Sequence, residues 1–199
     1  MKKIYFTIIL VLISLSNLKA ISYNSDPKIF VKELVQDALK ILGDKSLSKE
    51  DKSLSIEKIA LENVDIRAIG LYTLGETRKK VDKNTLEKYQ ELFEKYFLKS
   101  LISRLSDYSS QKFEVIDSTL KSSNYTMVKS KILSGGKTPD IQIDWRIYTK
   151  DPIKPLIRDL VVEGLSLAKT QKEEFQSILI SNDNNINALF IKLEEFVSK

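Results

Sequence analysis

The chain has 199 residues, of which 42% are hydrophobic and 30% charged, and its formal net charge is +5. It contains no histidine and no cysteine, which excludes Ser-His-Asp and Cys-His catalysis, thiolate chemistry and almost every type of zinc site. The composition does not exclude carboxylate-dependent chemistry, or a function that needs no catalytic group.

Residues 1–20 have the pattern of a secretory signal peptide. Lys2 and Lys3 precede an apolar run from Ile4 to Leu15, and the small residue Ala20 lies at a suitable cleavage point. The apolar run is shorter than the roughly 20 residues that span a bilayer. We expect cleavage after Ala20, with an uncleaved N-terminal anchor as the alternative.

The net charge changes once this segment is removed. Three of the 32 basic residues lie in it and none of the 27 acidic ones do, so residues 21–199 carry 29 basic and 27 acidic side chains, a net charge of +2. This is not the charge pattern of a nucleic-acid-binding protein. The 179 remaining residues suit one domain with a sizeable core.

The first half of this domain is predicted to be helical. Asp26 and Pro27 predict a helix start, and Gly43 predicts its end. A charged, serine-rich helix should follow from Ser48 to about Glu62, and another apolar segment from Val64 to Lys80. That segment contains two glycines, Gly70 and Gly75, which favour the close approach of a neighbouring helix over that of a ligand.

A long helix is expected next, capped by Asp82 and ending near Ser106. It carries a broad apolar and aromatic stripe, which is typical of a core-facing helix: Leu86, Tyr89, Leu92, Phe93, Tyr96, Phe97, Leu101 and Leu105. Residues Asp107–Gln111 are expected to form a loop.

After this loop the apolar residues alternate, as in strands. Four strands joined by short turns predict an antiparallel meander; they are Lys112–Ser118, Tyr125–Ser134, the strand of Ile143–Tyr148, and the strand that leads into Val162. A capping box at Thr170 and Glu173 predicts the start of a further helix. A polar turn over Ser181–Asn185 should precede the last helix. Helices, a sheet and helices in this order indicate an α+β fold.

Three acidic residues could support carboxylate-dependent hydrolysis. Asp144, Asp159 and Glu163 could lie on adjacent strands. Cross-strand ion pairs with Arg146 or Arg158 are the structural alternative, and we favour it because charges on the outer face of a sheet usually pair in this way.

Two blocks of residues resemble those of a known family. The first is Asp144-Trp145-Arg146, then Asp159, Val162-Glu163-Gly164-Leu165-Ser166, and Lys172 to Phe175; the second is Leu74-Gly75, Asp82, Leu86, Tyr89, Phe93 and Phe97. Together they resemble the MlaC family, also called the toluene-tolerance family, of periplasmic phospholipid-binding proteins of ABC transport systems. The run DWR…D…VEGLS is the specific part of this resemblance.

The resemblance implies a function without catalysis. Such proteins hold phospholipid acyl chains between a curved sheet and surrounding helices, with the headgroup in water, and need no cofactor. Their implied partners are an inner-membrane ABC transporter complex with a membrane-anchored lipid-binding subunit, and an outer-membrane lipoprotein complex. Shuttling phospholipid between them would maintain the lipid asymmetry of the outer membrane.

The resemblance also suggests which side chains would form the wall of an apolar lipid pocket. Helical residues Phe93, Phe97 and Leu101 would form one side, with Leu74 at the inner end. The sheet would form the other side with Val115, Val128, Ile132, Ile143, Trp145, Ile147, Leu160 and Val162. Each could equally be an ordinary core residue, because pocket linings are largely apolar as well. A secreted carboxylate-dependent hydrolase and a structural domain with a filled core are the alternatives.

Overall fold

The computed structural model describes residues 23–105, 112–136 and 139–199. The expected signal peptide and the loop Asp107–Gln111 lie outside these residues. The elements in chain order are α1 (Pro27–Gly43), α2 (Lys49–Asn63), α3 (Ile66–Leu74), the 3-10 helix η1 (Gly75–Lys79), α4 (Lys83–Leu105), β1 (Lys112–Ser122), β2 (Tyr125–Leu133), β3 (Ile141–Tyr148), β4 (Leu156–Val162), β5 (Leu165–Ser166), α5 (Leu167–Ile180) and α6 (Ile186–Ser198).

The N-terminal helices begin where their capping residues predict. The Asp26 carboxylate accepts hydrogen bonds from the N–H groups of Lys28 and Ile29, at 2.9 and 3.0 Å. The Ser48 hydroxyl accepts from Asp51 at 3.0 Å, and the Asp82 carboxylate from Thr85 at 3.0 Å. Each bond satisfies an N–H group that has no partner inside the helix. Within the part of the chain that the structure describes, no helix is both long and apolar enough to cross a membrane.

The sheet has five strands, whereas four were expected. Its order is β1-β2-β3-β4-β5, and every neighbouring pair is antiparallel. The additional strand β5 is two residues long and pairs with β4 across a tight turn, in which Glu163 and Gly164 have φ angles of 49° and 81°. A strand of two residues has no alternation that could reveal it in the sequence.

The predicted capping box at Thr170 is wrong. Helix α5 begins at Leu167, and Ser166 is its N-cap, with its hydroxyl accepting from the N–H of Lys169 at 3.1 Å. Thr170 lies in the first turn, where its hydroxyl donates to the Ser166 carbonyl at 3.0 Å. The turn that forms β5 places Ser166 at the helix start four residues earlier.

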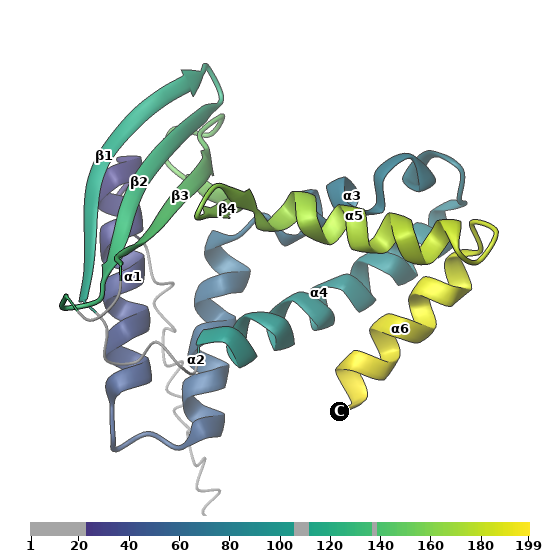
Figure 1. Ribbon diagram of the computed structural model, residues 1–199, viewed down its shortest axis with the longest axis horizontal. Coiled ribbons are helices and arrows are strands. Elements are labelled where there is room, and N and C mark those ends of the chain that lie inside the picture. The colour runs from purple at the N-terminus through teal and green to yellow at the C-terminus, as the bar shows by residue number, and fades with distance from the viewer. Residues whose placement is uncertain (1–22, 106–111, 137–138) are drawn as a thin grey trace, which may run out of the picture.

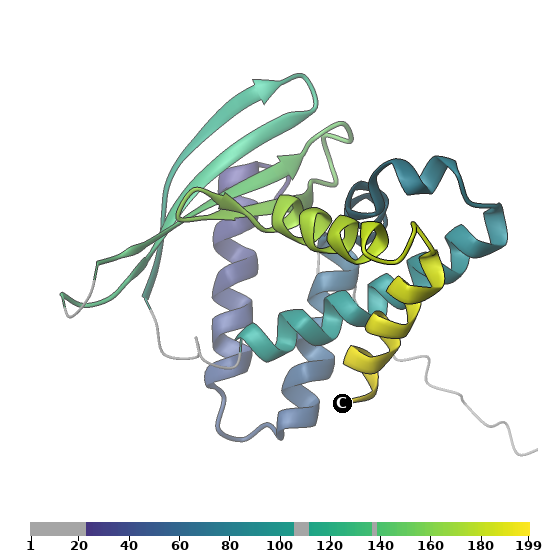
Figure 2. The same ribbon diagram turned by 45° about the vertical axis from the view of Figure 1, so that its right-hand side comes forward.

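The elements form two groups, which meet at β4 and where α2 contacts α4 (Figures 1 and 2). Helix α1 lies along one face of the curved sheet and pairs with α2, whereas helices α3 to α6 form a separate group beyond β4. Two hydrophobic clusters follow this division. The sheet cluster contains Phe30, Val31, Leu34, Ile59, Val128, Trp145, Ile147 and Ile157. The helical cluster contains Ile66, Ile69, Leu74, Tyr89, Phe93, Phe175, Leu179, Leu189, Phe190 and Leu193.

The glycine in α3 allows α4 to approach closely, as the sequence predicted. A Cβ atom at Gly70 would lie 2.8 Å from a ring carbon of Phe93 and 3.0 Å from the side-chain oxygen of Gln90. Both residues belong to α4. Gly75 instead ends α3, with a φ angle of 61° that glycine adopts without strain.

Candidate functional site

The twelve side chains predicted for the lipid pocket do not gather in one cluster. Six belong to the sheet cluster or pack against it: Val115, Val128, Ile143, Trp145, Ile147 and Leu160. Leu74, Phe93 and Phe97 belong to or pack against the helical cluster. Leu101, Ile132 and Val162 are in neither. The prediction that all twelve line one pocket remains a prediction.

Burial separates these residues into two groups. Leu74, Phe93, Val128, Trp145 and Ile147 are buried. The other seven are only partly buried: Phe97, Leu101, Val115, Ile132, Ile143, Leu160 and Val162. Apolar side chains that share a face and remain accessible are typical of binding surfaces.

The partly buried residues occupy two places in the fold, one on the sheet and one on α4. On the sheet, Ile143 pairs with Val162, so these two side chains share one face near the turn between β2 and β3. Phe97 and Leu101 lie in the C-terminal half of α4, the end that runs toward α1 and α2 (Figures 1 and 2). We call these seven side chains the apolar surface.

Trp145 is fixed at the centre of the sheet cluster. Its indole Nε1–H donates to the Ser130 hydroxyl at 2.8 Å, and that hydroxyl donates to the Ile143 carbonyl at 3.0 Å. The Phe113 ring meets the indole edge-on, with centroids 6.2 Å apart. The polar atom of the indole is therefore satisfied inside the protein, and the ring has one defined position.

The acidic residues of the run DWR…D…VEGLS join the sheet to α5. The buried Asp159 carboxylate accepts from the Ser166 hydroxyl at 2.6 Å and from the Ala168 N–H at 3.0 Å, and it pairs with Arg146 at 3.1 Å. Glu163 accepts from the N–H of Gln142. These contacts hold the β4–β5 turn and the start of α5 in place.

Cross-strand ion pairs of Asp144, Asp159 or Glu163 with Arg146 or Arg158 were expected, and among the described residues the pair of Asp159 with Arg146 is present. Arg158 has a different partner. Its guanidinium bonds to Asp65, the N-cap of α3, with Nε and Nη2 lying 2.8 and 2.7 Å from Oδ2. Burial alone would lower the pKa of Arg158, but hydrogen bonds to Tyr125 and Asp65 outweigh it and raise the pKa. Asp144 accepts from Gln142 at 3.1 Å. The three acidic residues therefore serve separate contacts.

The opposite face of the sheet carries a cleft that sequence reasoning missed. It has a volume of about 720 Å³ and lies between α3, the start of α5, and strands β1 to β4. Among its lining residues are Arg78, Lys121, Arg146 and Arg158, so we call it the basic cleft. A second cleft of about 450 Å³ lies over α5. Neither cleft contains any of the twelve predicted residues.

Comparisons with known proteins support the resemblance found in the sequence. A solved structure of a phospholipid-binding protein from Ralstonia solanacearum, in complex with a phospholipid, shares the fold with a TM-score of 0.69. The likeness covers 84% of this chain and 94% of that one, at 18% sequence identity. No curated protein matches the chain. The family model described as MlaC protein matches residues 32–195, and the chain therefore belongs to the MlaC family.

Proposed function

We propose that the protein is a periplasmic phospholipid carrier, secreted through a cleaved signal peptide. Membership of the MlaC family and a fold shared with a phospholipid-loaded protein support this function. In the proposal, the carrier exchanges lipid with an inner-membrane ABC transporter complex and an outer-membrane lipoprotein complex, and so helps to maintain outer-membrane lipid asymmetry. This is a binding function and uses no catalytic residue.

The energetics of lipid transfer explain why such a carrier is needed. Moving an acyl chain from water to an apolar site is worth about 0.8 kcal/mol per methylene. A diacyl phospholipid with roughly 30 methylenes therefore faces a barrier of about 25 kcal/mol to leave a membrane unaided. A carrier lowers this barrier by covering the chains with apolar side chains.

The apolar surface is the observation that carries the proposal. Ile132, Ile143 and Val162 are apolar, lie on the sheet face that elsewhere packs against α1, and yet remain partly accessible. In a domain whose sheet cluster is otherwise buried, this is where acyl chains would gain apolar contacts. Phe97 and Leu101 of α4 would meet the chains from the helical side.

Native mass spectrometry of protein purified without detergent tests the proposal. We expect a species heavier by one phospholipid for the wild type after expression in a Gram-negative host. Ile143→Asp should lose this species, because a carboxylate in contact with acyl chains is costly to bury. Ile153→Asp is the matched control, since Ile153 is 80% exposed in the turn before β4 and lies outside the apolar surface.

The outcomes separate the proposal from its alternatives. Lipid-free wild-type protein after gentle extraction would favour a structural domain with a filled core. Equal lipid loss in Ile143→Asp and Ile153→Asp would show that the apolar surface is not the site. N-terminal sequencing of the secreted protein should give Ile21, and a retained Met1 would contradict cleavage after Ala20.

A further inference from the structure

The basic cleft concentrates positive charge in a concave site. Four cationic side chains line it and Asp159 is the only acidic one, so its formal charge is +3. This exceeds the net charge of +2 that residues 21–199 carry altogether. A concave site with low-dielectric walls focuses such a charge and attracts anions. Its volume of about 720 Å³ is in the usual range of small-molecule sites.

The floor of the cleft is a row of paired residues on the sheet. Met127 pairs with Arg146, which in turn pairs with Asp159. By strand alternation their side chains point away from the face of Val128 and Trp145. The charged floor of the cleft and the strand residues of the apolar surface therefore lie on opposite faces of the same sheet.

The cationic groups differ in how much bonding capacity they have left. Arg158 is fully engaged: it bonds to Asp65 and to the Tyr125 hydroxyl, and its guanidinium carbon lies 3.4 Å from the centroid of the Tyr148 ring. Its charge is therefore paired with that of Asp65, and it fixes the wall of the cleft. Arg146 pairs with Asp159 through one nitrogen only, and its side chain is 48% exposed.

Two more donors enter from other elements. Arg78 of η1 donates one N–H to the Leu71 carbonyl, at 2.8 Å, which leaves most of its five N–H groups available. Lys121, at the end of β1, is exposed and makes no hydrogen bond or ion pair with the described residues. Three elements thus each direct a cationic donor with free N–H groups into one cleft. Two of these donors are guanidinium groups, whose geometry matches that of phosphate oxygens.

We propose that the basic cleft is a binding site for a phosphate group, separate from the apolar surface. The phosphate could belong to the headgroup of a phospholipid or to a free phosphate ester, and the chemistry of recognition is the same. Arg78, Arg146 and Lys121 donate to its oxygens, whereas Arg158 is ion-paired with Asp65 and keeps the wall of the cleft in place. An acidic segment of a partner protein is the competing occupant, but the small concave volume and the guanidinium donors favour phosphate.

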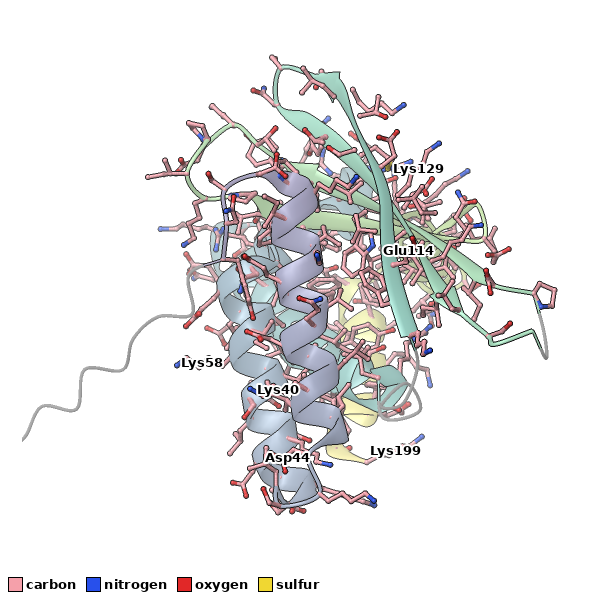
Figure 3. All side chains as sticks on the ribbon, turned by 90° about the vertical axis from the view of Figure 1, so that its left-hand side faces the viewer. Lys40, Asp44, Lys58, Glu114, Lys129 and Lys199 are labelled. Atoms are coloured by element: carbon pink, nitrogen blue, oxygen red, sulfur yellow. The ribbon has the colours of Figure 1, made fainter. Side chains whose placement is uncertain are left out.

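Titration followed by NMR tests this site. Inorganic phosphate and glycerol 3-phosphate, each added to delipidated protein at constant ionic strength, should shift the amide signals of Tyr125 to Met127 and the Nε–H signals of the cleft arginines. Lys121→Glu should weaken binding at least tenfold. Lys129→Glu is the matched control, because it makes the same charge change on an exposed lysine of β2 (Figure 3) that does not line the cleft. This variant should bind as the wild type does.

The same titration on lipid-loaded protein identifies the source of the phosphate. If the headgroup occupies the cleft, loaded protein should no longer respond to glycerol 3-phosphate. If the site takes a free phosphate ester, loaded and delipidated protein should respond equally. Either result supports the site.

Three results would overturn the site: no response at millimolar phosphate, equal weakening by Lys121→Glu and Lys129→Glu, or a response to a poly-glutamate peptide without one to phosphate. A lipid-free wild type would instead count against the carrier function and leave this test intact.

Discussion

The two hydrophobic clusters are built differently. In the helical cluster the Phe93 ring meets those of Tyr89, Tyr96, Phe97 and Phe175 at centroid distances of 5.9 to 6.3 Å. The Tyr89 hydroxyl is 2.9 Å from that of Thr73. Burial raises the pKa of this phenol, so it stays neutral. The helical cluster is a closed core in which the buried Tyr89 hydroxyl has a hydrogen-bond partner.

The sheet cluster is closed at its centre and open at one end. Val128, Trp145 and Ile147 are buried against α1, whereas Ile143 and Val162, farther along the same strands, are only partly buried. Only Val64 packs against both clusters in the described part of the chain. Such a division leaves the open end of the sheet accessible to a ligand.

The largest expected effect comes from breaking the closed cluster. Phe175→Ala should lower the free energy of unfolding by about 3–5 kcal/mol, because it empties a site that is 3% exposed and removes three ring contacts. Urea unfolding measures this loss of stability. At temperatures where the Phe175→Ala variant is still folded, the folded protein should still carry phospholipid. Lipid loss in a fully folded Phe175→Ala protein would mean that the helical cluster contributes to the site.

A smaller effect is expected at the centre of the sheet cluster. Trp145→Phe removes the N–H that donates to Ser130, a residue with no exposed surface, and also part of the ring. A lost buried hydrogen bond and the volume change together should cost about 1–3 kcal/mol. The cost should be the same for delipidated and lipid-loaded protein, as judged by unfolding midpoints. A much larger cost in loaded protein would place the indole in direct contact with lipid.

The junction of α3 and α4 offers a prediction of similar size. Gly70→Ala should destabilise the protein by about 1–3 kcal/mol, because overpacking outweighs the helix propensity of alanine. The added methyl group would meet Phe93 and Gln90. If this is the cause, Phe93→Leu in the same chain should restore part of the loss in a double-mutant cycle. Strict additivity of the two changes would contradict the packing explanation.

The sequence predicted those parts of the fold that depend on local signals. The caps at Asp26, Ser48 and Asp82 bond to N–H groups within three residues, and strand alternation identified which side chains share a face. The start of α5 was not predicted correctly, because both Ser166 and Thr170 are residues that can cap a helix. The tight turn before β5 places Ser166, and not Thr170, at the helix start.

Long-range arrangement could not be predicted from these signals. The pairing of Arg158 with Asp65 joins residues 93 positions apart, and the basic cleft depends on it. Periodicity also showed that Phe93 and Trp145 are core-facing, but not that they face different cores. The resemblance to a family predicted the function class, whereas the division into two clusters required the structure.

The smallest expected effect concerns pH, and it acts on the helical side alone. The Asp82 carboxylate accepts from the Thr85 hydroxyl and N–H at the start of α4, and these bonds lower its pKa from the ordinary value of 3.8. Because the pKa is lower in the folded state, the carboxylate contributes stability that is fully present at pH values above the ordinary pKa of 3.8. This stability is lost as the pH falls through the pKa of the folded state. Asp82→Asn keeps an N-cap acceptor but cannot titrate. Its unfolding midpoint should therefore fall less steeply than that of the wild type below pH 4, and should match it in slope between pH 5 and 8. If the unfolding midpoints of the two proteins fall equally steeply below pH 4, other carboxylates control the loss of stability in acid.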